Sequence, residues 1–306
     1  MLRALPIVVV AAIALVGCAE PTETVTTPPP TTASPEPTST TTPPVDTTVV
    51  QASSTSEGPP PCLDGDTPFS SSGIAGTFGS GTGDAAVVGG IRFAAHGGCE
   101  RIVIDLQTAG GSPAAMLGAS EVAVDAGLGV VTVALPPEMT TTAVADTLFE
   151  GSLVTRAFVY RTLGGALAVD LHMAEAVAAR GLLVLDPARL VVDVRPVEDG
   201  APLLGSPEVT PELVLLSPLP GPAEYPIVVH GYARTFEGNV VARLTDGTLT
   251  QEVVATAADW AETWGEFEAT IGLPEDGPFG AAELTVGSDD PEDGSFVGVG
   301  VTLDVR

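Results

Sequence analysis

Lysine is absent from the sequence, so all eleven basic residues are arginines, and 39 Asp and Glu residues give a net charge of −28. Without lysine the chain has no Schiff-base nucleophile, no P-loop lysine and no Ser-Lys dyad. Nucleic-acid phosphates are bound by clusters of Lys and Arg, and anionic lipid headgroups need a similar basic patch. We therefore expect no nucleic-acid partner and no attachment to a membrane through charge.

Catalytic and metal-binding motifs are also missing. The sequence has neither a Gly-x-Ser-x-Gly elbow nor a His-Glu-x-x-His motif. Its three histidines, His96, His172 and His230, are far apart and lack metal-ligand spacing. The acidic run at 289–294 does not have the spacing of an EF-hand loop, and we expect a solvated turn there. These absences predict a protein that is not an enzyme, with no catalytic residue, no metal and no cofactor.

The first residues have the pattern of an export signal. One positive charge at Arg3 precedes an apolar run at 4–16, which is shorter than the roughly 20 residues that span a bilayer. Residues 15–18, Leu-Val-Gly-Cys, resemble the lipobox of bacterial lipoproteins. The resemblance implies that residues 1–17 are removed, that Cys18 is lipidated, and that the protein is anchored on the outer face of the cell membrane. An ordinary cleaved signal peptide is the alternative.

Residues 18–61 are rich in Thr and Pro and contain few large apolar residues. Such a segment cannot bury enough apolar surface to offset the entropy lost on ordering. We therefore expect a disordered linker behind the lipidated cysteine, with a reach on the order of 100 Å in extended form.

From residue 62 onward the sequence is typical of β structure. Apolar and polar residues alternate along many short segments, as in the row Leu190, Val192 and Val194. Residues 77–83 are expected to form a glycine-rich loop, and only residues 173–180 have a helical pattern. Histidines 172 and 230 fall on the polar sides of such rows, so we expect them to be solvated. The prediction is an all-β protein with two antiparallel β-sandwich domains, at 62–200 and 212–306, joined by a linker at 201–211.

The first domain resembles the AMIN and AMIN-like domains. The resemblance rests on Ile-Arg-Phe at 91–93 with His96, on residues 100–105, and on residues 186–194. It implies a β-sandwich that binds peptidoglycan and targets the protein to the cell envelope. Arg92, His96 and Arg101 would then be donors to glycan or peptide carboxylates. The alternative is that they are structural, with Arg101 paired to a neighbouring strand.

Cys62 and Cys99 remain once Cys18 is assigned to the lipid. An even pair of cysteines in an exported chain favours a disulfide, which would contribute about 4 kcal/mol for a loop of this length. Two free, buried thiols are the alternative. Cys99 also departs from the AMIN-like pattern, where an apolar residue is expected, and this departure fits a disulfide with Cys62.

The second domain resembles the immunoglobulin-like domain that accompanies bacterial spore-germination proteins. The matching segments are 217–221, 231–234, 236–240 and 264–268. The resemblance implies a binding or spacing module without known chemistry. Trp260 and Trp264 could form a sugar-stacking patch, but a tryptophan in such a domain is more often part of the core.

Together these features predict a non-enzymatic cell-envelope lipoprotein that binds or organises peptidoglycan or an attached polymer through its AMIN-like domain. The alternatives are a protein-protein scaffold and an accessory subunit of an envelope enzyme or assembly. A solute-binding lipoprotein is disfavoured, because those proteins are usually α/β with a hinge.

Overall fold

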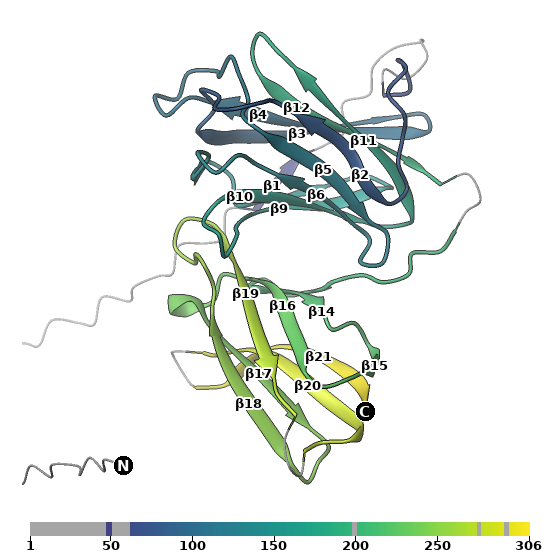
Figure 1. Cartoon of the computed structure of the whole chain (residues 1–306), viewed down its shortest axis with the longest axis vertical. Coiled ribbons are helices and arrows are strands. Elements are labelled where there is room, and N and C mark those ends of the chain that lie inside the picture. The colour runs from purple at the N-terminus through teal and green to yellow at the C-terminus, as the bar shows by residue number, and fades with distance from the viewer. Residues whose placement is uncertain (1–46, 51–61, 198–200, 274–276, 291–293) are drawn as a thin grey trace, which may run out of the picture. The chain divides into compact units, whose positions relative to one another are not determined.

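The computed structural model describes residues 47–50, 62–197, 201–273, 277–290 and 294–306 (Figure 1). The expected signal peptide, Cys18 and most of the expected linker lie outside these residues. The described residues form strands β1–β21 and one short 3-10 helix, η1. The all-β prediction is confirmed.

The first sandwich has two sheets, visible as two layers in Figure 1. One has the strand order β9-β10-β6-β5-β2, with β8 also paired to β9 and β1 to β8; the other has the order β11-β12-β4-β3-β7. The strands are β1 (Thr47–Val50), β2 (Gly73–Phe78), β3 (Val87–His96), β4 (Cys99–Gln107), β5 (Ser120–Asp125), β6 (Val130–Ala134), β7 (Thr141–Thr142), β8 (Asp146–Phe149), β9 (Val154–Arg161), β10 (Leu167–Met173), β11 (Val177–Val184) and β12 (Arg189–Pro196).

The alternation in the sequence fixes which side chains fill this sandwich. Ile102, Ile104 and Leu106 of β4 point inward and are buried, and they join a core cluster that includes residues from both sheets. Alternate residues of a strand point to opposite faces, so Arg101, Val103 and Asp105 lie on the outer face.

The second sandwich contains β13 (Glu208–Val209), β14 (Leu213–Ser217), β15 (Gly221–Ala223), β16 (Ile227–Ala233), η1 (Phe236–Gly238), β17 (Asn239–Thr245), β18 (Thr250–Thr256), β19 (Trp264–Ile271), β20 (Gly280–Asp289) and β21 (Phe296–Val305). Its sheets have the orders β13-β14-β16-β19 and β15-β21-β20-β17-β18. Both sheets contribute to a second core cluster.

Two local predictions were wrong. Residues 173–180 are not a helix, because β10 ends at Met173 and β11 starts at Val177, which pairs with β12. Ala178 and Ala179 of this run are buried in β11, and this tertiary packing overrides their helix propensity. Thr47–Val50, expected within the disordered linker, form β1 and pair with β8 in parallel. Their β-branched residues favour a strand once an open edge is available.

The two sandwiches share one continuous sheet. β19 pairs in parallel with β9, with Trp264 opposite Tyr160 and Gly265 opposite Arg161, and Val45–Arg306 form one compact unit. A separate buried cluster lies at this junction: Phe158, Tyr160, Ala168, Val214, Leu216, Tyr232 and Trp264. Trp264 is therefore buried, but its neighbours come from both sandwiches.

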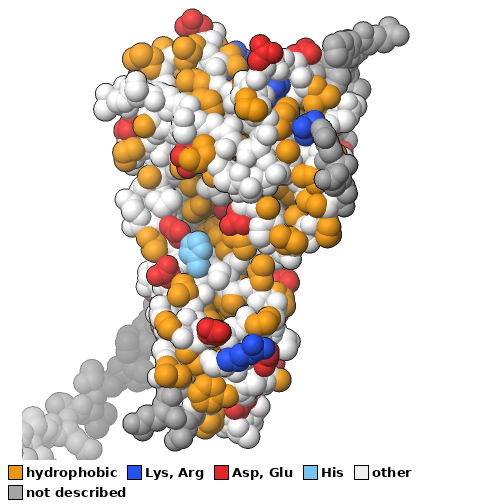
Figure 2. Space-filling model, turned by 45° about the vertical axis from the view of Figure 1, so that its right-hand side comes forward, with side chains coloured by type: hydrophobic (Ala, Val, Ile, Leu, Met, Phe, Trp, Pro, Cys, Tyr) orange, Lys and Arg blue, Asp and Glu red, His pale blue; other side chains and the backbone are white. Residues whose placement is uncertain are grey.

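The face shown in Figure 2 carries more acidic than basic side chains, interspersed with hydrophobic ones. This distribution follows from the excess of Asp and Glu over Arg in the sequence.

Because Trp264 is fully buried in the junction, its removal should weaken both sandwiches together. We expect residues 19–306 to unfold in a single calorimetric transition, and Trp264→Ala to lower the free energy of unfolding by about 3–5 kcal/mol. Trp260→Ala is the control, because that side chain is 42% exposed and should cost far less. Two wild-type transitions, of which Trp264→Ala shifts only one, would contradict this reading.

Candidate functional site

A groove of about 580 Å³ lies at one end of the first sandwich, where the two sheets part. It is bounded by the end of β5, the start of β6, the end of β10, the start of β11 and the end of β12. Residues 201–204 form a further wall. Ligand sites in proteins are commonly concave spaces of roughly this size.

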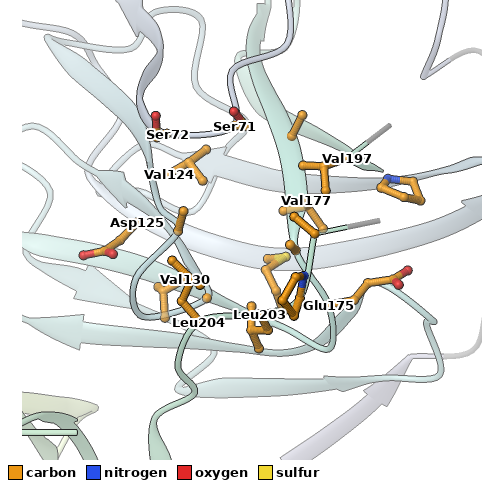
Figure 3. Close-up of a pocket in the computed structure, with 18 of the residues that line it drawn as sticks. Ser71, Ser72, Val124, Asp125, Val130, Glu175, Val177, Val197, Leu203 and Leu204 are labelled. Carbon is orange, nitrogen blue, oxygen red and sulfur yellow. The ribbon is translucent and has the colours of Figure 1, made fainter. Parts of the chain in front are cut away.

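The groove combines an apolar floor with a polar mouth (Figure 3). Val124, Val130 and Val177 line the inside, and the hydroxyls of Ser71 and Ser72 lie at one rim. The carboxylates of Asp125 and Glu175 lie on opposite sides of the apolar group. Apolar surfaces with a few oriented polar groups are typical of ligand sites.

Some polar groups at the rim are already used in hydrogen bonds within the protein and are not free to bind a ligand. The Asp125 carboxylate accepts hydrogen bonds from the backbone N–H groups of Gly127 and Leu128, at 2.9 and 3.0 Å. It therefore shapes the turn after β5. The exposed hydroxyl of Ser72 and the exposed carboxylate of Glu175 have no such structural bond among the contacts of the described residues.

Phe69, which lines the groove, lies against two arginines of the sheet that contains β11 and β12. The guanidinium groups of Arg180 and Arg195 stack on the Phe69 ring, 4.7 and 4.9 Å from its centroid. Arg180 is buried and also donates to the Asp193 carboxylate at 3.1 Å. Cation–π contacts and charge-assisted hydrogen bonds of this kind fix side-chain positions.

The segment before β2 is held onto that face by the same arginine. Arg180 donates to the backbone carbonyls of Cys62, Asp64 and Thr67, at 3.1, 2.6 and 3.2 Å. Cys62 is joined to Cys99 by a disulfide, with a Cα–Cα distance of 6.2 Å. The covalent bond and the buried guanidinium together place Phe69, Ser71 and Ser72 at the groove.

The three residues predicted to bind a ligand lie on β3 and β4, outside the groove lining. Arg92 makes two hydrogen bonds to Asp105, at 2.6 and 2.7 Å, in an exposed ion pair. Arg101 binds both carboxylate oxygens of Asp193, at 2.6 and 2.9 Å, and this is the strand-neighbour pairing that was the alternative interpretation. His96 is half-buried at the end of β3, opposite Cys99.

Each of these ion pairs stabilises the charged form of its arginine. The hydrogen bonds that Arg92 donates to Asp105 and Arg101 donates to Asp193 raise the pKa of each arginine. Asp193 is fully buried and shared between Arg101 and Arg180. Sequence reasoning missed Arg180 and Asp193, although each is a charged residue inside an otherwise apolar run, which is the signal that could have identified them.

The junction between the sandwiches holds a second group of buried polar residues. His172 and the Tyr232 hydroxyl are 2.6 Å apart, and the rings of Tyr160 and Tyr232 stack at 4.7 Å. The Asp146 carboxylate lies between the Arg156 guanidinium, at 2.9 Å, and the Trp264 indole N–H, at 3.2 Å.

The prediction that His172 is solvated was wrong. It occupies the polar face of its own sandwich, but the second sandwich covers that face with Tyr232. His230 is half-buried and forms a 2.7 Å contact with Glu266, so it is not a fully solvated residue either. An alternation pattern identifies the core side of a strand but cannot show that a second domain covers the other side.

Burial shifts two pKa values in opposite directions at the junction. It raises the pKa of Asp170 to about 7, although a hydrogen bond from Thr132 at 2.7 Å opposes the shift. It lowers the pKa of His172 to about 4, and the charge of Arg156 acts in the same direction. Near neutral pH, His172 is therefore an uncharged imidazole.

No group of three or more His, Cys, Asp or Glu side chains within the described ranges is arranged to hold a metal ion. The same residues include no helix with the length and hydropathy needed to cross a bilayer.

The structure thus defines a protein of two β-sandwiches joined through a shared sheet, with a groove in the first. Residues 213–295 match a family described as the immunoglobulin-like domain of bacterial spore germination (Gmad2), which confirms the resemblance of the second domain. Neither a curated protein nor a solved structure matches the chain.

The two shifted pKa values predict opposite pH dependences. Asp170 has a raised pKa in the folded state, so its contribution to stability is lost as pH rises from about 4 to 7; His172 has a lowered pKa, so its contribution is lost as pH falls from about 6.5 to 4. Each slope is at most about 1.4 kcal/mol per pH unit, and the two oppose each other between pH 4 and 6.5.

Single substitutions should separate the two effects in denaturant unfolding at pH 4 to 7. Relative to wild type, Asp170→Asn should gain stability as pH rises, whereas His172→Gln should lose it. Parallel pH profiles for the two variants and wild type would show that neither group is perturbed.

The two candidate arginines should differ in their effect on stability. Arg92→Ala should change the free energy of unfolding by less than about 1 kcal/mol, because its ion pair is exposed. Arg101→Ala should cost about 3 kcal/mol, the low end for breaking a buried pair, because Arg180 still neutralises Asp193. Urea unfolding measures both values, and equal values would contradict the structural role of Arg101.

Proposed function

We propose that the protein is a non-enzymatic lipoprotein of the cell envelope, which binds peptidoglycan or an attached polymer through its first sandwich. The groove beside Phe69 and its two stacked arginines is the observation that carries this proposal. A groove with an apolar floor and hydroxyls at its rim suits a glycan or a short peptide, which present apolar faces and many hydrogen-bonding groups.

The sequence supports the same proposal. The AMIN-like motifs at 91–93, 100–105 and 186–194 belong to β3, β4 and β12 and the turn before β12. Lipidation of Cys18 and the Thr/Pro-rich residues 18–61 would tether the sandwiches outside the cell membrane.

The geometry favours neutral over anionic parts of such a polymer. Arg92 and Arg101 are paired with Asp105 and Asp193, so neither charge is available without breaking an ion pair. Binding through the groove should therefore depend weakly on salt, in contrast to binding by a basic patch.

The test is co-sedimentation of residues 19–306 with purified cell-wall sacculi across a salt series. We expect saturable pelleting that Ser72→Trp weakens at least tenfold, because the exposed residue at the mouth of the groove becomes a bulky side chain. Ser112→Trp is the matched control, because Ser112 is exposed in the loop after β4 of the same sandwich and does not line the groove.

The predicted donors Arg92 and His96 are tested in the same assay. The Arg92→Ala/His96→Ala variant leaves the buried Asp193 pair intact, so a change in pelleting reports binding rather than unfolding. Equal pelleting of wild type and Ser72→Trp, with loss in the Arg92→Ala/His96→Ala variant, would move the site from the groove to this face. Absence of pelleting at every salt concentration would overturn the proposal.

A protein-protein scaffold is the second candidate function. The shared sheet and the buried cluster at the junction favour it, because they hold two binding modules in one fixed arrangement. Cross-linking of the membrane-anchored protein in cells would then capture a specific partner even when Ser72→Trp abolishes pelleting.

A further inference from the structure

Two large aromatic side chains of the second sandwich lie together on its surface. Phe236 and Trp260 are 56% and 42% exposed, with ring centroids 6.0 Å apart and planes inclined by 56°. Phe236 begins η1, between β16 and β17, and Trp260 lies between β18 and β19. Exposed aromatic pairs of this kind are enriched at interaction surfaces.

The backbone beneath the pair is fixed. Glu237 and Gly238 both adopt the left-handed conformation, with φ of 55° and 69°. The Gly238 carbonyl accepts from Ala257 N–H at 2.8 Å, which ties the two connections together. A Cβ at position 238 would lie 3.3 Å from Trp260 Cδ1, so the indole rests directly on the glycine.

A carboxylate holds the Trp260 loop from the other side. One oxygen of Asp259 accepts from the backbone N–H groups of residues 260, 261 and 262, at 2.7, 3.0 and 3.1 Å. Its other oxygen binds Arg161 of the first sandwich at 2.9 Å. Polar contacts therefore position both rings without covering them, which lowers the entropy cost of binding.

The charge around the pair is negative. Glu237 adjoins Phe236 in the sequence and is exposed. The Glu262 side chain is 67% exposed and lies 3.4 Å from the Arg161 guanidinium, so Arg161 faces two carboxylates, those of Asp259 and Glu262. One guanidinium compensates only one of these two carboxylates, so the group of Asp259, Glu262 and Arg161 keeps a net negative charge. The faces of Trp and Phe rings attract cations, and a surrounding acidic surface concentrates them.

We propose that the Phe236–Trp260 pair is a docking surface for a cationic side chain, a guanidinium or an ammonium, on a basic segment of a protein partner. The cation would stack on the ring faces, while Glu237 and the net negative charge of the Asp259, Glu262 and Arg161 group balance its charge. This surface belongs to the second sandwich and is separate from the groove, so it adds a protein partner to the proposed binding of the cell wall.

The experiment follows the two indole N–H signals in the NMR spectrum of residues 19–306, since the chain has only two tryptophans. A capped tetra-arginine peptide should shift the Trp260 signal saturably and leave that of buried Trp264 unchanged. The isosteric tetra-citrulline peptide lacks the charge and should produce no shift, and an N-acetylglucosamine tetrasaccharide should also produce none.

Variants separate ring stacking from general charge attraction. Phe236→Leu keeps the charge and should weaken tetra-arginine binding about threefold to tenfold, while Phe279→Leu, an exposed phenylalanine at another position of the same sandwich, should not. Glu237→Gln should weaken it about twofold to threefold at low salt. Ser72→Trp should leave tetra-arginine binding unchanged. A negative result in this experiment can therefore be told apart from a negative result for cell-wall binding by the groove.

Three outcomes would overturn the proposal. Equal affinities of wild type and Phe236→Leu for tetra-arginine would show that the peptide is attracted only by the overall negative charge of the protein. A Trp260 shift with tetra-citrulline or the tetrasaccharide would assign the pair to neutral ligands. A shift that depends on protein concentration alone would assign it to self-association.

Discussion

Trp264 occupies the place where the two sandwiches become one sheet. Its backbone pairs with Tyr160 of β9, its ring lies against Phe158 and Tyr232, and its indole N–H reaches the buried Asp146. Because a buried tryptophan needs both apolar neighbours and a partner for its N–H, this residue requires the two domains to meet in one arrangement. The other junction contacts, including those of His172 and Asp259, depend on the same register.

The few arginines are committed mainly to carboxylates. Arg101 and Arg180 share Asp193, Arg156 binds Asp146, and Arg161 binds Asp259. Burying a carboxylate is costly unless a cation compensates it, so this strongly acidic chain uses its cations to stabilise its interior. The surfaces that remain suit neutral or cationic ligands, which is consistent with an apolar groove in the first sandwich and an aromatic pair in the second.

The sequence predicted most of the fold, because each strand carries its own alternation. The rows around Ile102 and Leu190 identified the inner faces of the first sandwich, and the motifs around residues 231–240 identified the second domain. The errors arose where tertiary contacts override local pattern. The alanines before Arg180 have high helix propensity, yet they lie in a strand paired with β12, and the polar face around His172 is buried by the other domain.

The sequence by itself determined the β class, the division into two sandwiches and the scarcity of cations, since these depend on composition and on a period of two along the chain. Only the tertiary structure decided which residues form the candidate sites. The groove is made by the ends of five strands and by residues 201–204, and Phe236 meets Trp260 across two separate connections. No local sequence pattern predicts these contacts, because they depend on strand pairings between residues far apart in the chain.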